Sequence, residues 1–206
     1  MNDKNFHVLR PGAGIAEKTI DSKTIFKGRI LKLRVDEVEL PDKKRSAREV
    51  VEHSGAVAIV PVLDNGNILF VKQYRYPISD FLLELPAGKL DRADERLEDC
   101  ARRELLEETG YCCETLEKAV EFYTTPGFCD EQIHLFIARG LKPGKSDGCD
   151  YDEFISIIDY PLEVAMKMIL ENKIFDAKTM LGILYYSAAD KSNIISTANS
   201  SKLKIR

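Results

Sequence analysis

The stretch GKLDRADERLEDCARRELLEETGY, residues 88–111, decides the fold of this chain. Within it, Leu97 to Glu108 repeats apolar residues at the spacing of an amphipathic helix. Gly110 stands just past the last turn, where glycine commonly ends a helix because it accepts a left-handed backbone. The pattern therefore predicts a helix over residues 97–108, with faces that can be assigned residue by residue.

The predicted helix carries carboxylates on its apolar side. On a wheel of about 100° per residue with Leu97 at zero, Glu104 falls at about −20° and Glu108 at about +20°. Glu107 lies at the border of the same stripe. The apolar members of the stripe are Leu97, Cys100, Ala101 and Leu105. The sequence thus directs two glutamates toward the side that should face the core.

A bound divalent cation would explain glutamates in this position. Buried carboxylates without partners cost several kcal/mol, and like charges one helical turn apart repel each other. Hard cations such as Mg²⁺ take oxygen ligands and usually share the site with substrate phosphates. The alternative is a solvated helix face on which Arg102 and Arg103 pair with the glutamates, as in many surface ion pairs. The position on the apolar stripe favours the cation.

The segment Gly88-Lys-Leu-Asp-Arg-Ala-Asp-Glu95, followed after residues 96–102 by Arg103-Glu-Leu-Leu-Glu-Glu-Thr-Gly-Tyr111, closely resembles the Nudix box. The box has the pattern G-x5-E-x7-R-E-U-x-E-E-x-G-U, in which U is a bulky apolar residue. One departure is visible, because counting from Gly88 places the first acid at Asp94 and counting back from Arg103 places it at Glu95. The loop thus holds one extra residue, while the catalytic half keeps its spacing.

The resemblance implies a metal site on the box. The implied metal ligands are the backbone of Ala87 and the side chains of Glu104, Glu107 and Glu108. Arg103 and Glu95 would brace the loop against the helix, and Arg103, Glu107 and Glu108 would belong to the catalytic machinery. The expected cofactor is Mg²⁺, with Mn²⁺ as the alternative because both accept octahedral oxygen sites.

The resemblance also implies a general base on a late acidic loop. In the ADP-ribose pyrophosphatase subfamily a glutamate on such a loop often takes this role. Here Asp150-Tyr-Asp-Glu153 is the suitable loop, so Glu153 is the candidate and Asp152 the second choice. The alternative is a solvated charge run on a surface loop.

Further segments resemble those of the ADP-ribose subfamily, namely Gln73–Pro77, Leu83–Leu90, Thr125–Glu131 and Phe175–Lys178. Arg75 would bind a phosphate or the terminal ribose, because guanidinium matches phosphate oxygens, or it is a surface arginine. Glu84 would contact the metal site or the nucleoside, or it points outward from a strand. Pro126, Gly127 and Glu131 complete the substrate-binding candidates, with Glu131 otherwise a polar loop residue.

These features imply Mg²⁺-dependent hydrolysis of the diphosphate bond of a nucleoside diphosphate sugar. The leading substrate is ADP-ribose, which would give AMP and ribose 5-phosphate. One alternative is GDP-mannose or another nucleotide sugar, and another is a non-catalytic module that binds ADP-ribose. The complete segment from Arg103 to Glu108 favours the enzyme, since a sensor does not need every metal ligand.

The composition restricts the partners. The 206 residues carry a formal net charge of −4, which argues against nucleic acid or an anionic membrane as the main partner. No apolar run has the length of a transmembrane helix. The five cysteines form no CxxC pair, so we expect reduced thiols in a cytoplasmic protein. A small anionic substrate stays compatible with this charge, because a local basic cluster or a metal reverses its sign.

The expected fold class is α/β, a Nudix-type α/β/α sandwich with a mixed sheet and a small N-terminal antiparallel β element. Residues 1–50 would form an arm and this β element, 51–190 the Nudix hydrolase domain, and 191–206 a flexible tail. The resemblance implies a homodimer through the N-terminal strands. Apolar strands at 56–63 and 68–74 are predicted to pair across the turn Asp64–Asn67, and helices are predicted near 162–172 and 177–188.

Overall fold

The computed structural model describes residues 16–90, 92, 94–145 and 155–202, with residues 191–202 described by their backbone alone. Two compact units divide the chain, and each is described by itself. The first comprises the described residues up to His53 together with Thr125–Glu131. The second comprises Ser54–Thr124 and the described residues from Gln132 onward.

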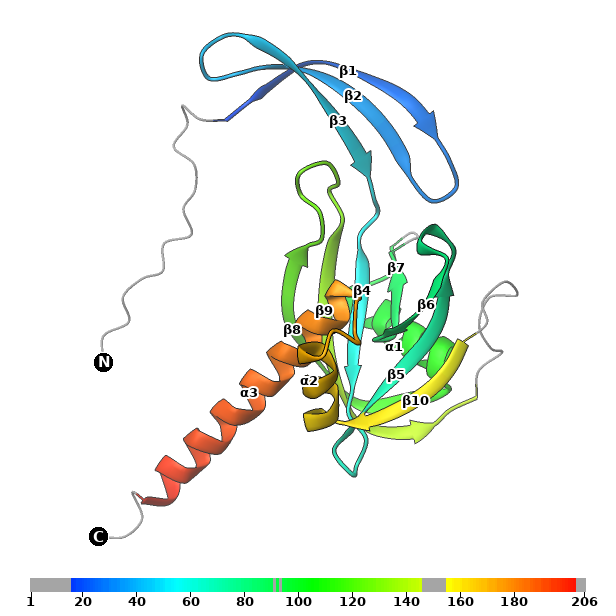
Figure 1. Ribbon diagram of the computed structural model, residues 1–206, viewed down its shortest axis with the longest axis vertical. Coiled ribbons are helices and arrows are strands. Elements are labelled where there is room, and N and C mark those ends of the chain that lie inside the picture. Colours follow the sequence, from blue (N-terminus) through cyan, green and yellow to red (C-terminus); the bar gives the residue numbers. More distant parts are fainter. Residues whose placement is uncertain (1–15, 91, 93, 146–154, 203–206) are drawn as a thin grey trace. The chain divides into compact units, whose positions relative to one another are not determined.

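The first unit contains an antiparallel sheet of three strands in the order β1-β2-β3 (Figure 1). The strands are β1 (Lys18–Lys27), β2 (Lys32–Glu39) and β3 (Arg45–Glu52). The segment Thr125–Glu131 joins the sheet through a parallel bridge between Val51 and Cys129. Strand β1 is exposed along its whole length, including the large apolar side chains Ile20, Ile25 and Phe26. The unit therefore presents apolar surface that its own sheet leaves uncovered.

The second unit contains two sheets and the helices. One sheet is mixed, with the order β7-β4-β9-β8 and a parallel pair β4–β9, and the other is antiparallel, with the order β10-β5-β6. The strands are β4 (Ala56–Pro61), β5 (Asn67–Arg75), β6 (Asp80–Glu84), β7 (Ala87–Lys89), β8 (Tyr111–Tyr123), β9 (Gln132–Pro143) and β10 (Ile155–Pro161). The helices are α1 (Leu97–Thr109), α2 (Leu162–Leu170) and α3 (Ala177–Lys202), with a 3₁₀ turn η1 at Tyr76–Ile78.

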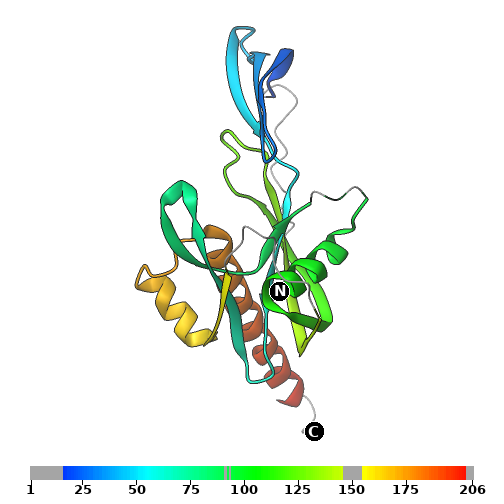
Figure 2. The same cartoon turned by 90° about the vertical axis from the view of Figure 1, so that its right-hand side faces the viewer.

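Strand β4 lies at the centre of the second unit, and both of its faces are buried. Val57 and Ile59 pack on one face with Cys100, Ala101 and Leu105 of α1. Ala58 and Val60 face the opposite cluster, which includes Ala165 of α2 and Ile183 of α3. Each fully buried large aliphatic side chain contributes about 1.5–3 kcal/mol. Figure 2 shows α1 and the pair α2–α3 on opposite sides of the strands, which is the predicted sandwich.

The turn at Asp64–Asn67 is present, but the two strands that it joins enter different sheets. The Leu63 amide donates to the Asn67 carbonyl at 2.9 Å, and a single bridge pairs Val62 with Ile68. Beyond this bridge β4 pairs with β7 and β9, whereas β5 pairs with β6 and β10. The predicted pairing of residues 56–63 with 68–74 is therefore wrong. Strand β4 is buried over its whole length and β5 over Ile68–Val71, and each strand has a central place in its own sheet.

The box helix has the predicted bounds to within one residue, ending at Thr109 before Gly110 in a left-handed conformation. The last helix is longer than predicted, since α3 continues past residue 188 to Lys202. No glycine or proline follows Gly182 in the sequence, so no helix-breaking residue ends it earlier. Over the described ranges, none of the helices combines the length and apolar character that crossing a membrane requires.

Candidate active site

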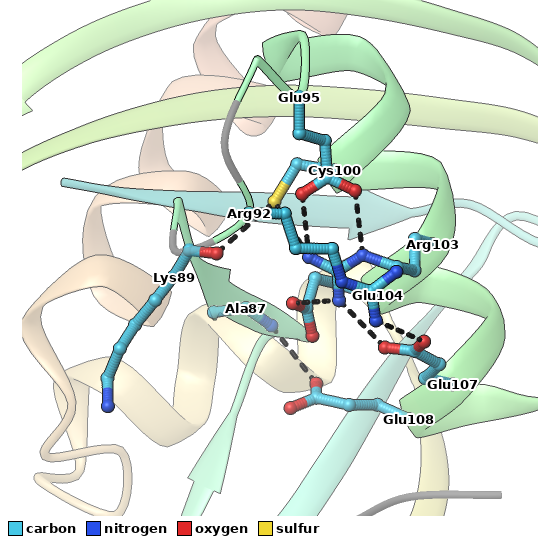
Figure 3. A network of polar contacts seen from close by, with 9 residues as sticks. All are labelled: Ala87, Lys89, Arg92, Glu95, Cys100, Arg103, Glu104, Glu107 and Glu108. Atoms are coloured by element: carbon cyan, nitrogen blue, oxygen red, sulfur yellow. Dashed lines mark hydrogen bonds and ion pairs between the residues drawn. The ribbon is translucent and has the colours of Figure 1, made fainter. Parts of the chain in front are cut away.

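Helix α1 lies against the short strand β7, and this contact fixes the position of two box glutamates (Figure 3). The amide of Ala87 donates to Oε2 of Glu108 at 3.0 Å. The carboxyl of Glu104 fills the space beside Gly88, where an added Cβ would overlap it. Glycine at position 88 therefore permits the close approach of strand and carboxylate. Glu108 is buried and Glu107 lies at the border of the stripe, in agreement with the helical wheel.

Arg103 binds three carboxylates on this side of α1. Its Nε and Nη2 donate to the two oxygens of Glu95 at 2.8 and 2.9 Å. Its Nη1 donates to Glu104 at 2.6 Å and to Glu107 at 2.8 Å. The hydrogen bonds from Arg103 lower the pKa of Glu95, and those to Glu95 and Glu107 raise the pKa of Arg103 well above its usual range. The guanidinium thus ties the loop before α1 to the helix.

The extra residue in the box loop is taken up before Glu95. Asp94 adopts a left-handed backbone with φ of 61°, a conformation that aspartate tolerates better than most residues. Glu95, and not Asp94, then makes the two hydrogen bonds to Arg103. Counting back from Arg103 therefore identifies the acid that braces the loop.

The residues of this site fit a hard divalent cation. We use the name Arg103 cluster for Arg103, Arg92, Glu95, Glu104 and Glu107, in which Arg92 also pairs with Glu107 at 3.3 Å. Together with Glu108, four carboxylates face two guanidiniums, and Figure 3 shows the Lys89 side chain pointing away from them. Carboxylate and carbonyl oxygens are the ligands that Mg²⁺ prefers. Among the described residues, no group of three or more acids, histidines or cysteines is already gathered around a metal position.

Cys100 lies beneath the Arg103 cluster, and its thiol donates weakly to the carbonyl of Lys89 at 3.5 Å. Burial raises the pKa of Cys100 to about 12. The thiol therefore stays protonated at neutral pH, and it is not a nucleophile. Its role is packing in the cluster between α1 and β4.

A second network joins the ends of β5 and β6 to the start of α3. We use the name Glu84 cluster for Glu84, Arg75, Lys178 and Asp176. Arg75 donates from Nε and Nη2 to the two oxygens of Glu84 at 2.6 and 2.7 Å, and the ammonium of Lys178 pairs with the same carboxylate. Lys178 also pairs with Asp176 at 3.0 Å. The side chain of Glu84 is 1% exposed, so this is a buried ion-pair network and not an outward-pointing glutamate.

The charges in the Glu84 cluster keep its acid ionised. Burial by itself would raise the pKa of Glu84, but the hydrogen bonds from Arg75 and the charge of Lys178 outweigh it, so the pKa is lowered. The hydrogen bonds to Glu84 raise the pKa of Arg75 in turn. Arg75 also lies close enough to Glu108 for their charges to interact. The chain also links the two groups, because Glu84 stands three residues before Ala87, whose amide donates to Glu108.

The resemblance of Phe175–Lys178 to the subfamily does not by itself indicate a role for Lys178. Asp176 caps α3, because its Oδ2 accepts hydrogen bonds from the amide and the hydroxyl of Thr179 at 3.0 and 2.5 Å. Lys178 thus stands in the first turn of the helix, where the helix dipole disfavours a cation. That unfavourable position is the signal that could have indicated a buried acidic partner.

The remaining candidates belong to neither cluster. Pro126, Gly127 and Glu131 belong to the segment of the first unit, where Glu131 lies 3.6 Å from Nδ1 of His53. Glu153 and Asp152 lie outside the described residues. The structure brings together Ala87, Glu104, Glu107, Glu108 and Arg103, and next to them Arg75 and Glu84.

Two family models match the chain. One, described as NUDIX domain, covers residues 52–180. The other, described as nucleoside diphosphate sugar hydrolase N-terminal domain, covers residues 17–51. The boundary between the two matches falls within two residues of the boundary between the compact units at His53.

Known proteins resemble the chain over most of its length. The methanol dehydrogenase activator of Bacillus methanolicus is 47% identical over 171 residues, covering 82% of this chain and 91% of the relative. The ADP-ribose pyrophosphatase of Bacillus subtilis (strain 168) is 45% identical over 172 residues, covering 83% and 92%. The crystal structure of an ADP compounds hydrolase superposes with a TM-score of 0.77 at 20% identity, covering 86% of this chain and 95% of that chain. This last likeness shows the fold, which is the predicted one.

Proposed function

The chain belongs to the Nudix family, and from that premise we propose that it hydrolyses the diphosphate bond of ADP-ribose to give AMP and ribose 5-phosphate. The observation that carries the proposal is the contact between α1 and β7, where Glu108 binds the amide of Ala87 and Glu104 lies against Gly88. The relative that is 45% identical is an ADP-ribose pyrophosphatase, which supports this substrate over other nucleotide sugars.

We propose Mg²⁺ as the cofactor, held by Glu104, Glu107, Glu108 and the backbone of Ala87. When bound, it neutralises diphosphate charge and lowers the pKa of a bound water. Arg103 orients Glu104 and Glu107 through its hydrogen bonds. Glu153 is proposed to take the proton of the attacking water, and Arg75 to bind a phosphate oxygen. Pro126, Gly127 and Glu131 are proposed to contact the rest of the substrate.

A phosphate-release assay tests this function directly. Phosphatase added to a reaction with Mg²⁺ and ADP-ribose removes phosphate from AMP and ribose 5-phosphate but not from intact ADP-ribose. We expect phosphate release that requires the divalent cation. A panel with GDP-mannose, other nucleotide sugars and dinucleotides then ranks the substrates. Tight binding of ADP-ribose without release of phosphate would identify a non-catalytic binding module and overturn the proposal.

We also propose that the protein is a cytoplasmic homodimer that pairs through the first unit. The exposed apolar side chains Ile20, Ile25 and Phe26 of β1 support this, because apolar surface of this kind marks interaction sites. Sedimentation analysis should give twice the mass of one chain, and the substitution Ile25→Lys should lower it toward one chain. A monomeric wild-type protein contradicts the dimer without affecting the proposed reaction.

A second candidate function is activation of a dehydrogenase. The relative that is 47% identical and almost fully covered is a methanol dehydrogenase activator, which favours this role. Addition of the protein to purified methanol dehydrogenase, with and without Mg²⁺, should raise its rate. An unchanged rate would leave hydrolysis as the function.

A further inference from the structure

The buried carboxylate of Glu84 has two cationic partners that differ in exposure. The side chain of Arg75 is 41% exposed, whereas that of Lys178 is 13% exposed. A carboxylate as buried as Glu84 needs at least one charged partner, because an unpaired buried charge is strongly destabilising. Arg75 therefore has access to solvent and ligands, while Lys178 is placed to stay paired with Glu84.

We propose that Lys178 is a positioning residue for Arg75. Lys178 keeps Glu84 paired while the guanidinium of Arg75 turns from Glu84 to a phosphate oxygen of the substrate. This inference rests on the proposed function, in which Arg75 binds the diphosphate. Without Lys178, Arg75 would have to stay on Glu84, and substrate would have to compete with a buried carboxylate for the same guanidinium.

The first turn of α3 holds Lys178 in this place. Asp176 pairs with Lys178 at 3.0 Å and caps the helix through Thr179. The hydroxyl of Thr179 accepts a hydrogen bond from the amide of Leu85 at 2.7 Å, so the same turn also anchors the residue after Glu84. Lys178 thus approaches Glu84 from α3, whereas Arg75 approaches it from the end of β5.

The Glu84 cluster is connected to the box by a short stretch of chain. After Leu85, the carbonyl of Pro86 accepts a hydrogen bond from Ile59 at 2.9 Å, and the amide of Ala87 donates to Glu108. Arg75 holds a carboxylate that stands three residues before Ala87, whose amide binds the box glutamate Glu108. An arginine in this position can bind either of two anionic groups, the buried carboxylate of Glu84 or a phosphate of the substrate.

A purely structural role for Lys178 makes a different prediction. If Lys178 only stabilises the start of α3, its loss affects substrate binding equally whether or not Arg75 is present. If it acts through Arg75, its loss has little effect once Arg75 is gone. A double-mutant cycle measures this difference, because residues that act through each other give non-additive effects.

The experiment measures the affinity of the protein for ADP-ribose by calorimetry in the presence of a chelator, and KM and kcat separately with Mg²⁺. We expect Lys178→Met to weaken binding and raise KM by about tenfold, with a smaller change in kcat, as for the loss of one partner of a charge pair. In the Arg75→Ala background the same substitution should change affinity by less than about twofold. Lys178→Arg should restore binding, and Lys173→Met, at an exposed lysine paired with Glu171, is the matched control.

Equal losses of affinity in both backgrounds, or wild-type affinity in Lys178→Met, overturn the inference. If Lys178→Met does not fold, the substitution is instead made in the Glu84→Gln variant and compared with that variant. Glu84→Gln removes the negative charge that Lys178 offsets. Lys178→Met added to Glu84→Gln should then change affinity by less than about twofold, and a tenfold loss would contradict the proposal. A wild-type protein that binds ADP-ribose without cleaving it refutes the proposed hydrolysis, while the binding cycle still decides the role of Lys178.

Discussion

The Arg103 cluster and the Glu84 cluster are both networks of basic and acidic side chains, but the first has an excess of negative charge and the second is neutral. In the first, Glu95, Glu104 and Glu107, with Glu108 nearby, carry four negative charges against the two guanidiniums of Arg103 and Arg92. In the second, Arg75 and Lys178 balance Glu84 and Asp176. The excess of acid in the first network favours a divalent cation, whereas the second is neutral without one.

Burial explains why the two clusters differ. Glu84 is 1% exposed, and a net charge there would carry a large desolvation cost. Glu107 is 34% exposed, so water screens part of the charge excess when no cation is present. A fully buried network must therefore contain all of its own counter-charges, while a partly exposed cluster can leave some of them to a ligand.

The largest effect is expected from Glu108→Gln. The amide keeps an oxygen for the hydrogen bond from Ala87, so the fold should survive, but the charge that the proposed cation would bind is lost. We expect kcat for ADP-ribose to fall by more than about 100-fold. Substituting a residue that only hydrogen-bonds to a metal ligand already lowers metal affinity or activity by about 10–100-fold. Glu98→Gln, at an exposed glutamate of the same helix, is the matched control. Near-normal turnover would remove Glu108 from the ligand set.

The Glu84 cluster should contribute to stability independently of metal. Glu84→Ala leaves Arg75 and Lys178 without their shared partner, and we expect the free energy of unfolding to drop by about 3 kcal/mol. Urea unfolding measured with Mg²⁺ and with a chelator should give the same loss. If Mg²⁺ restored the stability, the view that this cluster is complete without a cation would fail.

The Arg103 cluster should respond to metal in the opposite way. Arg103→Met leaves Glu95, Glu104 and Glu107 without the guanidinium that they share. Because this site is only partly buried, we expect the free energy of unfolding to drop by about 2 kcal/mol. Millimolar Mg²⁺ should restore part of the melting temperature, since a divalent cation replaces the missing charge. Arg102→Met is the control, because Arg102 bonds to Cys113 and not to the glutamates. An unchanged response to Mg²⁺ would falsify the cation site.

The smallest effect concerns acid pH. The pKa of Glu84 is lowered in the folded protein from its ordinary value of 4.5. The unfolded chain therefore takes up this proton first, so the stability from Glu84 is complete above pH 4.5 and is lost as the pH falls below that value. Melting temperatures measured from pH 6 downward should fall less steeply in Glu84→Gln than in the wild type. Equal slopes would show that Glu84 does not contribute to acid unfolding.

Much of the Arg103 cluster could be predicted because its members are close in sequence. The helical period directs Glu104 and Glu108 inward, and Gly110 ends the helix, from local geometry alone. The spacing of the box does not distinguish Asp94 from Glu95 as the acid that braces the loop. In the structure Asp94 takes a left-handed backbone, and Glu95 binds Arg103. The strand pairing across Asp64–Asn67 was predicted wrongly because an apolar run indicates burial without indicating its neighbours.

The sequence by itself determined the box helix, its inward carboxylates and the family, since these depend on spacings of a few residues. Only the tertiary structure decided that Glu84 is shared by Arg75 and Lys178. Lys178 is separated from Glu84 by 94 residues, and it reaches the carboxylate because α3 packs on the core that β4 and Leu85 form. Local patterns specify which face of an element is buried, whereas the partner of a buried charge depends on how distant elements pack together.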